Sequence, residues 1–169
     1  MVTKAARIYQ ETKRPLNCGL SKVKGHQMER LPLNGYEQKV LIEGKRKDSP
    51  IIITLHGGPG TPIPFSVGCR GLFPAFTDIF IMVYWDQLGS GINNYVIDDT
   101  FSIDSFVQMT EELVAQIKKK FPNNKVMIFS TSWGSILSTK LLERNPNAVD
   151  AVIACGQIVK NVGSIPKFV

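Results

Sequence analysis

Four short apolar runs, separated by amphipathic segments, restrict this chain to one class of fold. The runs show no alternation of polar and apolar side chains, which is typical of strands buried on both faces of a parallel sheet. They are Ile51–Leu55, Ile79–Tyr84, Val126–Phe129 and Ala151–Ala154. Because helical patterns alternate with these runs, we expect an α/β fold with a mostly parallel sheet and flanking helices.

Two segments between and after these runs have the periodicity and the end signals of helices. The apolar residues of Ser102–Phe121 gather on one helical face, and Ser102 is a suitable N-cap. The last turn holds Lys118–Lys120, where the helix dipole favours cations, and Pro122 follows as a stop signal. The second helix is expected over Trp133–Asn145. Strand–helix–strand units of this kind indicate an open α/β sheet.

A hairpin is expected ahead of the parallel strands. Asn34-Gly35 is the strongest short signal for a two-residue turn, and it separates Met28–Leu33 from Tyr36–Glu43. Pro32 has no backbone N–H to donate, so its strand belongs at an edge of the sheet.

The charge is distributed unevenly along the chain of 169 residues. Residues 1–47 hold 11 Lys and Arg against 4 Asp and Glu, whereas residues 48–169 hold 9 against 10. We expect a basic N-terminal segment over residues 1–27 and one folded domain over residues 28–169. The basic residues are dispersed and few aromatic side chains lie among them, so a nucleic-acid partner is not expected. No apolar run approaches the ~18 residues of a membrane-spanning helix, so a membrane partner is not expected either.

The start of the chain and the use of cysteine both favour a reducing cytoplasm. No apolar stretch of a secretory signal follows Met1. Cys18, Cys69 and Cys155 are odd in number, lie far apart and form no CxxC pair. This spacing indicates neither a zinc site nor a disulfide framework, and we expect no metal and no other cofactor.

The sharpest candidate for chemistry is Ser132, in Ser130-Thr131-Ser132-Trp133-Gly134 between a predicted strand and a predicted helix. A serine on a tight strand-to-helix turn projects its hydroxyl out of the sheet, and small residues two positions on either side let strand and helix pack closely. The helix N-terminus would direct the Trp133 backbone N–H towards a developing oxyanion. The alternative is an ordinary helix cap made by Thr131 or Ser132.

Two glycine-rich segments follow two of the other predicted strands. In His56-Gly57-Gly58-Pro59-Gly60, consecutive glycines let backbone N–H groups face a bound anion. A phosphate loop and a plain turn are the alternatives, although Thr61-Pro-Ile-Pro cannot open the helix that a phosphate loop needs. Asp86-Gln87-Leu88-Gly89-Ser90-Gly91 is by itself a carboxylate in a glycine-rich turn. Ligand sites of open α/β sheets lie at the carboxyl ends of strands, where all three segments are expected.

Together the three segments resemble the α/β-hydrolase fold and, within it, the proline iminopeptidase-like serine peptidases. That family carries a His-Gly-Gly-Pro-Gly oxyanion loop, an Asp-Gln-Arg-Gly-Ser-Gly turn and a Gly-Gly-Ser-Trp-Gly elbow in this order. The resemblance runs from about Met28 to Val159. The chain departs from the pattern at two positions, since Ser130 stands in place of a glycine and Leu88 in place of an arginine.

The resemblance implies a role for each candidate site residue. Ser132 would be the nucleophile that attacks a peptide carbonyl and releases an N-terminal proline through an acyl-enzyme. Gly58 and Trp133 would supply the N–H groups of the oxyanion hole. The residues that would shape the loops around the site are His56, Gly57, Pro59, Gly60, Asp86 and Gly134.

The acid and the histidine of a catalytic triad have no clear candidates in the chain. In this fold they follow the serine in the order Asp or Glu, then His. The 37 residues after Ser132 contain Glu143 and Asp150 but no histidine. We expect Glu143 to point away from the strand ends and Asp150 to lie at the wrong end of the sheet; the chain's histidines are His26 and His56. The sequence therefore resembles the N-terminal half of a hydrolase without cap and last strands, and we expect it to be inactive alone.

Two other functions are compatible with these residues. An esterase or lipase-like fragment is one, because the residues that select substrate in the family would lie in the absent cap. A non-catalytic binding module on the same fold is the other, and the absent triad histidine favours it. The expected partners are a peptide or small ester in the complete enzyme, and a separate C-terminal half or a second copy at the open edge strand Ala151–Ala154.

Overall fold

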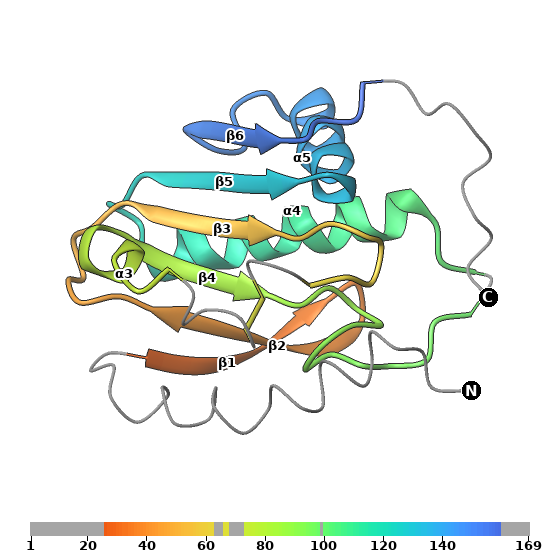
Figure 1. The fold of residues 1–169 in the computed structure, drawn as a ribbon, viewed down its shortest axis with the longest axis horizontal. Helices are drawn as coiled ribbons and strands as arrows, with labels where there is room; N and C mark the ends of the chain where they lie inside the picture. Colours follow the sequence, from red (N-terminus) through yellow and green to blue (C-terminus); the bar gives the residue numbers. More distant parts are fainter. Residues whose placement is uncertain (1–25, 63–65, 68–72, 99, 160–169) are drawn as a thin grey trace.

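Six strands form one sheet with flanking helices (Figure 1). The computed structural model describes residues 26–62, 66–67, 73–98 and 100–159, so the expectations for Cys18, Cys69 and most of the N-terminal segment lie outside the described residues. The elements are β1 (His26–Leu33), β2 (Tyr36–Glu43), β3 (Ile51–Leu55), α3 (Phe76–Ile79), β4 (Ile81–Trp85), α4 (Ile103–Lys120), β5 (Val126–Thr131), α5 (Trp133–Arg144) and β6 (Ala151–Cys155).

The strand order is β1-β2-β4-β3-β5-β6. Strand β2 pairs antiparallel with β1 and with β4, whereas β4, β3, β5 and β6 run parallel to one another. The predicted α/β class with a mostly parallel sheet is therefore confirmed. Because the four parallel strands share one direction, their carboxyl ends lie at the same end of the sheet.

The predicted hairpin is present and lies at the edge. Asn34 and Gly35 both have positive φ, 48° and 79°, as a two-residue type I′ turn requires. Strand β1, which contains Pro32, is the edge strand of the sheet, as expected for a residue with no N–H to donate. Strand β1 begins at His26, two residues before the predicted start at Met28.

Apolar clusters cover both faces of the sheet. The larger cluster packs side chains of the strands against Leu113 of α4 and Leu137 of α5. The smaller cluster holds Ile52 and Met82, which point to the opposite face, and Phe76 of α3 packs against it. Helices therefore lie on both faces, and α4 and α5 share one of them (Figure 1).

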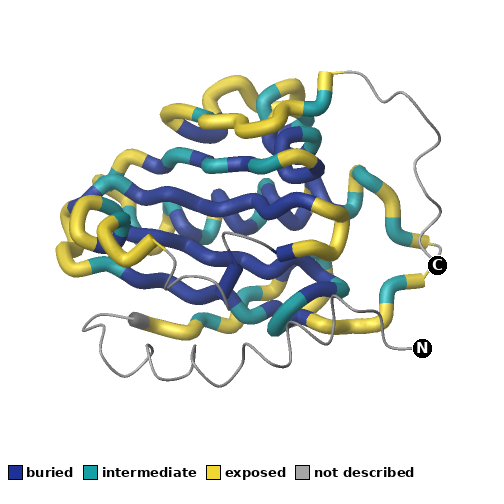
Figure 2. The backbone as a smooth tube through the Cα atoms, in the orientation of Figure 1, coloured by how far each residue is buried: buried dark blue, intermediate teal, exposed yellow. Residues whose placement is uncertain are grey.

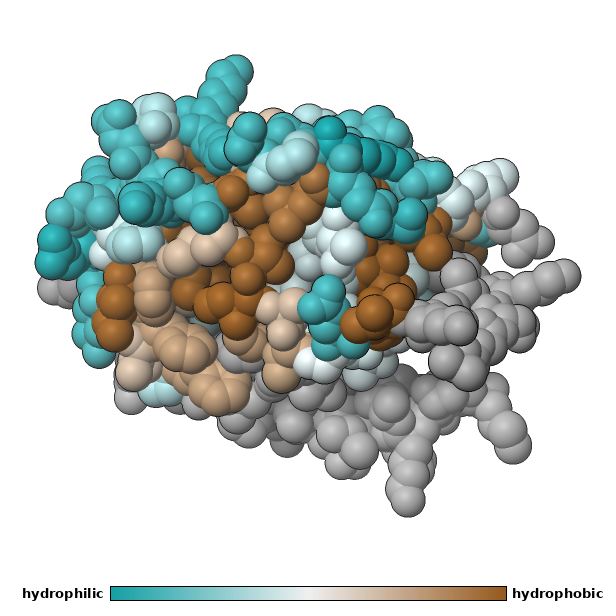
Figure 3. All heavy atoms as spheres, turned by 90° about the horizontal axis from the view of Figure 1, so that it is seen from above, coloured by the Kyte–Doolittle hydropathy of each residue, from teal (hydrophilic) through white to brown (hydrophobic). Residues whose placement is uncertain are grey.

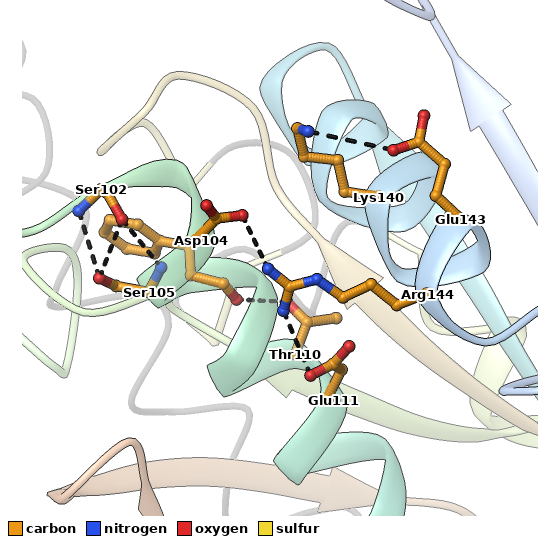
Figure 4. Close-up of polar contacts among 9 residues, drawn as sticks. Ser102, Asp104, Ser105, Thr110, Glu111, Lys140, Glu143 and Arg144 are labelled. Atoms are coloured by element: carbon orange, nitrogen blue, oxygen red, sulfur yellow. Dashed lines mark hydrogen bonds and ion pairs between the residues drawn. The ribbon is translucent and has the colours of Figure 1, made fainter.

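Polar contacts fix the start of α4 and join it to α5 (Figure 4). Ser102 is the N-cap of α4 and forms a reciprocal capping box with Ser105, which confirms the predicted start. Arg144 at the end of α5 forms ion pairs with Asp104 at 2.7 Å and Glu111 at 3.4 Å. These exposed pairs each contribute at most about 1 kcal/mol, so apolar packing contributes more than they do to holding the two helices together.

Two of the predicted strands differ from the observed ones. The run Ile79–Tyr84 was expected as one strand, but Ile79 ends α3 and is 60% exposed, and Phe80 caps that helix by donating its N–H to the Phe76 carbonyl oxygen. The apolar run therefore crosses a helix–strand junction, and β4 begins only at Ile81.

Strand β6 was expected to be buried on both faces, and this is wrong. Four of its five residues are exposed, including Ile153 at 50%, because β6 is the edge strand at the opposite side of the described sheet from β1 (Figure 2). Figure 3 views the molecule from this side and shows hydrophobic side chains gathered in the middle of the surface.

Candidate functional site

Ser132 lies at the turn between β5 and α5, at the carboxyl end of the parallel strands. Its backbone has φ 47° and ψ −115°, a conformation that costs an L-residue about 1–3 kcal/mol. Its side chain makes no capping hydrogen bond and the residue is exposed, although the neighbouring Trp133 and Gly134 are buried. The alternative of a helix cap by Ser132 is thus wrong. The turn instead presents the hydroxyl to solvent at the strand ends.

Small residues on both sides of Ser132 allow the turn to close. A Cβ on Gly134 would lie 2.2 Å from the Leu55 carbonyl oxygen, so only glycine lets α5 approach β3 this closely. Ser130 occupies the position that is glycine in the proline iminopeptidase-like elbow motif. It is buried, and its Oγ lies 3.0 Å from the Ser138 Oγ. The extra hydroxyl is therefore accommodated by a hydroxyl partner on α5.

The glycine loop after β3 lies against the elbow. A Cβ on Gly57 would lie 3.4 Å from the Ser132 Cβ. Gly58 has φ 120°, and a Cβ there would lie 2.6 Å from the Gly60 backbone nitrogen, so this position requires glycine. No acceptor among the described residues takes a hydrogen bond from the backbone N–H of Gly58 or of Trp133. Both N–H groups are thus without an acceptor among the described residues, as the oxyanion-hole hypothesis requires.

His56 is buried and both nitrogens of its ring have hydrogen-bond partners. Nδ1 donates to the Gly57 carbonyl oxygen at 2.8 Å, and Nε2 accepts from the Gln87 backbone N–H at 2.9 Å. Burial lowers the pKa of His56 to about 4, so the ring is neutral near pH 7. With its lone pair engaged, this imidazole shapes the loop and is not available to Ser132 as a base.

Asp86 organises the turn after β4. Its carboxylate accepts hydrogen bonds from the backbone N–H groups of Val67 and Ile92, at 2.9 and 3.0 Å. Gly91 lies so close that a Cβ on it would be 1.9 Å from Oδ2 of Asp86. Burial outweighs these hydrogen bonds and raises the pKa of Asp86 to about 6. The Asp86 carboxyl group thus connects residues 67 and 92 through their backbone N–H groups.

Sequence reasoning missed three side chains that complete this region. Gln87 bonds to both His56 and Trp133, and Ser90 Oγ lies 3.2 Å from His56 Nε2. Asn93 ties the turn to β2, since its amide donates to the Lys39 carbonyl oxygen at 2.8 Å. Only the resemblance could have indicated Gln87, because a glutamine in a glycine-rich turn is otherwise expected at the surface.

A small cavity of about 90 Å³ lies beside the glycine loop. Leu88, which stands where the family has arginine, lines it and is only 2% exposed. The other lining residues are Pro59, Gly60, Gln87, Gly89, Ile97 and Phe106. A larger depression of about 540 Å³ is lined by Lys45, Lys120 and Phe121 among others, but none of the candidate site residues lines it.

The described residues bring no general base to Ser132. The Asp150 carboxylate accepts from the Val126 N–H at the start of β5, which is the opposite end of the sheet. Glu143 lies 4.0 Å from Lys140 on the outer surface of α5 (Figure 4). His26 pairs in register with Glu43, again at the end of the sheet away from Ser132.

The described ranges hold neither a metal-binding cluster nor a membrane-spanning helix. These ranges contain no group of three or more His, Cys, Asp or Glu residues placed to hold a metal ion. Among them no helix is long and apolar enough to cross a membrane. One buried polar atom of the described residues, Thr131 Oγ1, has no hydrogen-bond partner, and it lies beside the glycine loop.

The family model for the alpha/beta hydrolase fold matches residues 50–168. The chain belongs to the α/β hydrolase family. It is 29% identical over 135 residues to the probable aminopeptidase YbaC of Bacillus subtilis, covering 78% of this chain and 42% of the relative. It is 36% identical over 103 residues to a proline iminopeptidase of Heyndrickxia coagulans, covering 60% of this chain and 33% of the relative.

Solved α/β hydrolase structures agree with this assignment. A proline iminopeptidase-related protein from Thermus thermophilus superposes with a TM-score of 0.62 at 22% identity, over 78% of this chain and 44% of that one. A 2-hydroxy-6-oxo-6-phenylhexa-2,4-dienoate hydrolase from Rhodococcus has a TM-score of 0.61 at 27% identity, over 79% and 47%. The chain thus spans less than half the length of these relatives.

Proposed function

We propose that this chain is the nucleophile-bearing portion of a serine hydrolase of the proline iminopeptidase type. The observation that carries the proposal is the strained, exposed Ser132, which lies at the N-terminus of α5 beside the glycine loop. The names of the curated relatives, an aminopeptidase and a proline iminopeptidase, support the choice of substrate.

The arrangement suits acyl transfer. Ser132 Oγ would attack the carbonyl carbon of the substrate while a base takes the hydroxyl proton. The carbonyl oxygen would gain negative charge and accept hydrogen bonds from the N–H groups of Gly58 and Trp133. The carbon–nitrogen bond then breaks, the amine leaves with a proton, and water hydrolyses the ester on Ser132.

The chain alone is expected to have no turnover, because no described residue can act as that base. Loss of the triad base typically lowers the rate roughly 10⁴–10⁶-fold. Ser132 is exposed, so imidazole from solution can act as the general base, and it provides a test that uses this chain as it is.

The experiment measures hydrolysis of a proline arylamide and of a short-chain aryl ester, with and without imidazole. Ser132→Ala removes the nucleophile, and Thr139→Ala removes an exposed hydroxyl elsewhere on α5 as the matched control. We expect an imidazole-dependent rate in the wild type and in Thr139→Ala, above the rate in Ser132→Ala.

Three results would contradict or narrow the proposal. Equal imidazole-dependent rates in wild type and Ser132→Ala contradict it and favour a non-catalytic binding module. Turnover of the ester but not of the arylamide favours an esterase. Wild-type turnover that needs no imidazole but vanishes in Ser132→Ala would reveal a base in the chain, with His56 as the first candidate.

A further inference from the structure

Gln87 is a buried residue with hydrogen bonds on two sides. It is 1% exposed, and its Oε1 accepts from the Trp133 indole Nε1 at 2.9 Å. Its Nε2 donates to the His56 carbonyl oxygen at 3.2 Å, and its backbone N–H donates to His56 Nε2 at 2.9 Å. This one residue therefore joins the start of the glycine loop to the first residue of α5.

The bridge requires a side-chain amide, because it needs a donor and an acceptor at the same time. A glutamate carboxylate offers only acceptors and a leucine offers neither. In either case a buried group at His56 or Trp133 would lose its partner, which is costly for the local geometry.

No other hydrogen bond among the described residues joins residues 56–60 to residues 131–134. Gly57 also lies beside Ser132, since a Cβ added to it would be 3.4 Å from the Ser132 Cβ. An oxyanion hole works only when its donors lie about 2.7–3.1 Å from the oxyanion, so the separation of the two segments matters. Beyond the end of the β3–β5 ladder, where Leu55 pairs with Ser130, the hydrogen-bonded connection between the two segments runs through Gln87.

We propose that Gln87 is a positioning residue that sets the distance between the Gly58 and Trp133 N–H donors. The proposal rests on the function proposed above. Gln87 touches no reacting atom; it acts by holding His56 and Trp133 at a fixed spacing. Misplacement of catalytic groups by about 1 Å can cost roughly 100-fold in rate. Removal of the bridge should therefore slow reaction at Ser132 about 10- to 100-fold without unfolding the protein.

The chain offers a closely matched control for this test. Gln38 is a second buried glutamine whose Oε1 accepts from a tryptophan indole, Trp85 Nε1, at 2.8 Å. Its Nε2 lies 3.3 Å from Met109 Sδ, within the core and not at the candidate site. Gln38→Leu therefore removes the same chemistry as Gln87→Leu in a place that should not affect Ser132.

The first measurement is imidazole-assisted labelling of Ser132 by a fluorophosphonate, under conditions where circular dichroism shows each variant folded. The second is the ¹H–¹⁵N spectrum of the indole N–H groups, of which the chain has two because it has two tryptophans. In Gln87→Leu we expect slower labelling and a shifted Trp133 indole signal. In Gln38→Leu we expect wild-type labelling and a shifted Trp85 signal.

Gln87→Glu gives a readout that loss of packing would not produce, and it keeps the side-chain size. Once protonated, the introduced carboxyl group can again donate to the His56 carbonyl oxygen, so the labelling rate of this variant relative to wild type should rise as the pH falls. The titratable groups close to residue 87 are His56 and Asp86, and the ratio to wild type removes their contribution.

The outcomes separate the two proposals. If Gln87→Leu is labelled as fast as the wild type although its Trp133 signal is shifted, the role of Gln87 is overturned and the proposed function stays intact. A Gln87→Glu rate ratio that does not change with pH also overturns it. A wild type that is not labelled at Ser132 even with imidazole overturns the proposed function, and the positioning role falls with it.

Discussion

Replacing Ser132 by glycine should stabilise the protein, although glycine normally destabilises. The Ser132 backbone, with φ 47° and ψ −115°, costs an L-residue about 1–3 kcal/mol, and glycine adopts this conformation at little cost. Glycine in turn costs about 0.5–1 kcal/mol through the greater freedom of the unfolded chain. The balance favours Ser132→Gly over Ser132→Ala by about 1 kcal/mol, since alanine keeps the strain. The serine side chain is exposed and makes no capping hydrogen bond, so Ser132→Ala itself should change stability by under about 0.5 kcal/mol.

The assay is urea unfolding followed by far-ultraviolet circular dichroism, with the free energy of unfolding extrapolated to water. Thr139 provides the control pair, because it is exposed on the same helix. There, glycine should be less stable than alanine by about 1 kcal/mol. The sign of the glycine–alanine difference should thus reverse between positions 132 and 139. If glycine is the less stable residue at both positions, the elbow is not strained and the reasoning fails.

Three further predictions concern packing, pH and association. Gly134→Ala should lower the free energy of unfolding in urea by about 3 kcal/mol, since its Cβ would meet the Leu55 carbonyl oxygen at 2.2 Å; a loss under about 1 kcal/mol would contradict the close approach. Burial raises the pKa of Asp86 from 3.8 to about 6, so its protonation favours the folded state below pH 4, and this contribution to stability is lost as the pH rises through 6. Burial lowers the pKa of His56 from 6.5 to about 4, so its neutral ring contributes stability above pH 6.5, and this contribution is lost as the pH falls through 4. The two contributions oppose each other, so the free energy of unfolding of the wild type should change little between pH 4 and 6.5. That of Asp86→Asn, which keeps only the His56 contribution, should fall on acidification. Urea-unfolding free energies of the two proteins that run parallel with pH would refute this. We also expect self-association through the exposed edge strand β6, and Ile153→Lys should reduce it in sedimentation experiments; an unchanged distribution of species would exclude this edge.

Local patterns predicted the elements whose causes are local. The Asn34-Gly35 turn, the Ser102 cap and the strand before Ser132 all depend on residues within a few positions of one another. The strand-to-helix turn at Ser132 is local as well, although the need for glycine at position 134 arises from the distant Leu55 carbonyl oxygen of β3. These features were therefore readable from the sequence.

Features that depend on distant partners were not readable in the same way. An apolar run does not show where a helix ends and a strand begins, so Ile79 and Phe80 were assigned to β4 although they end and cap α3. Nor does it show how far helices cover the faces of a strand, so the edge position of β6 was expected but the exposure of its side chains was not. Gln87 bonds to residues 31 and 46 positions away, and no local period records such contacts.

The central claim is that the nucleophile and the oxyanion donors are assembled while the described residues supply no base. Its most direct test is peptide mapping by mass spectrometry after treatment with a fluorophosphonate, with and without imidazole. The account predicts modification at Ser132 that depends on imidazole. Modification of other serines in its place, or of Ser132 at the same rate without imidazole, would contradict it.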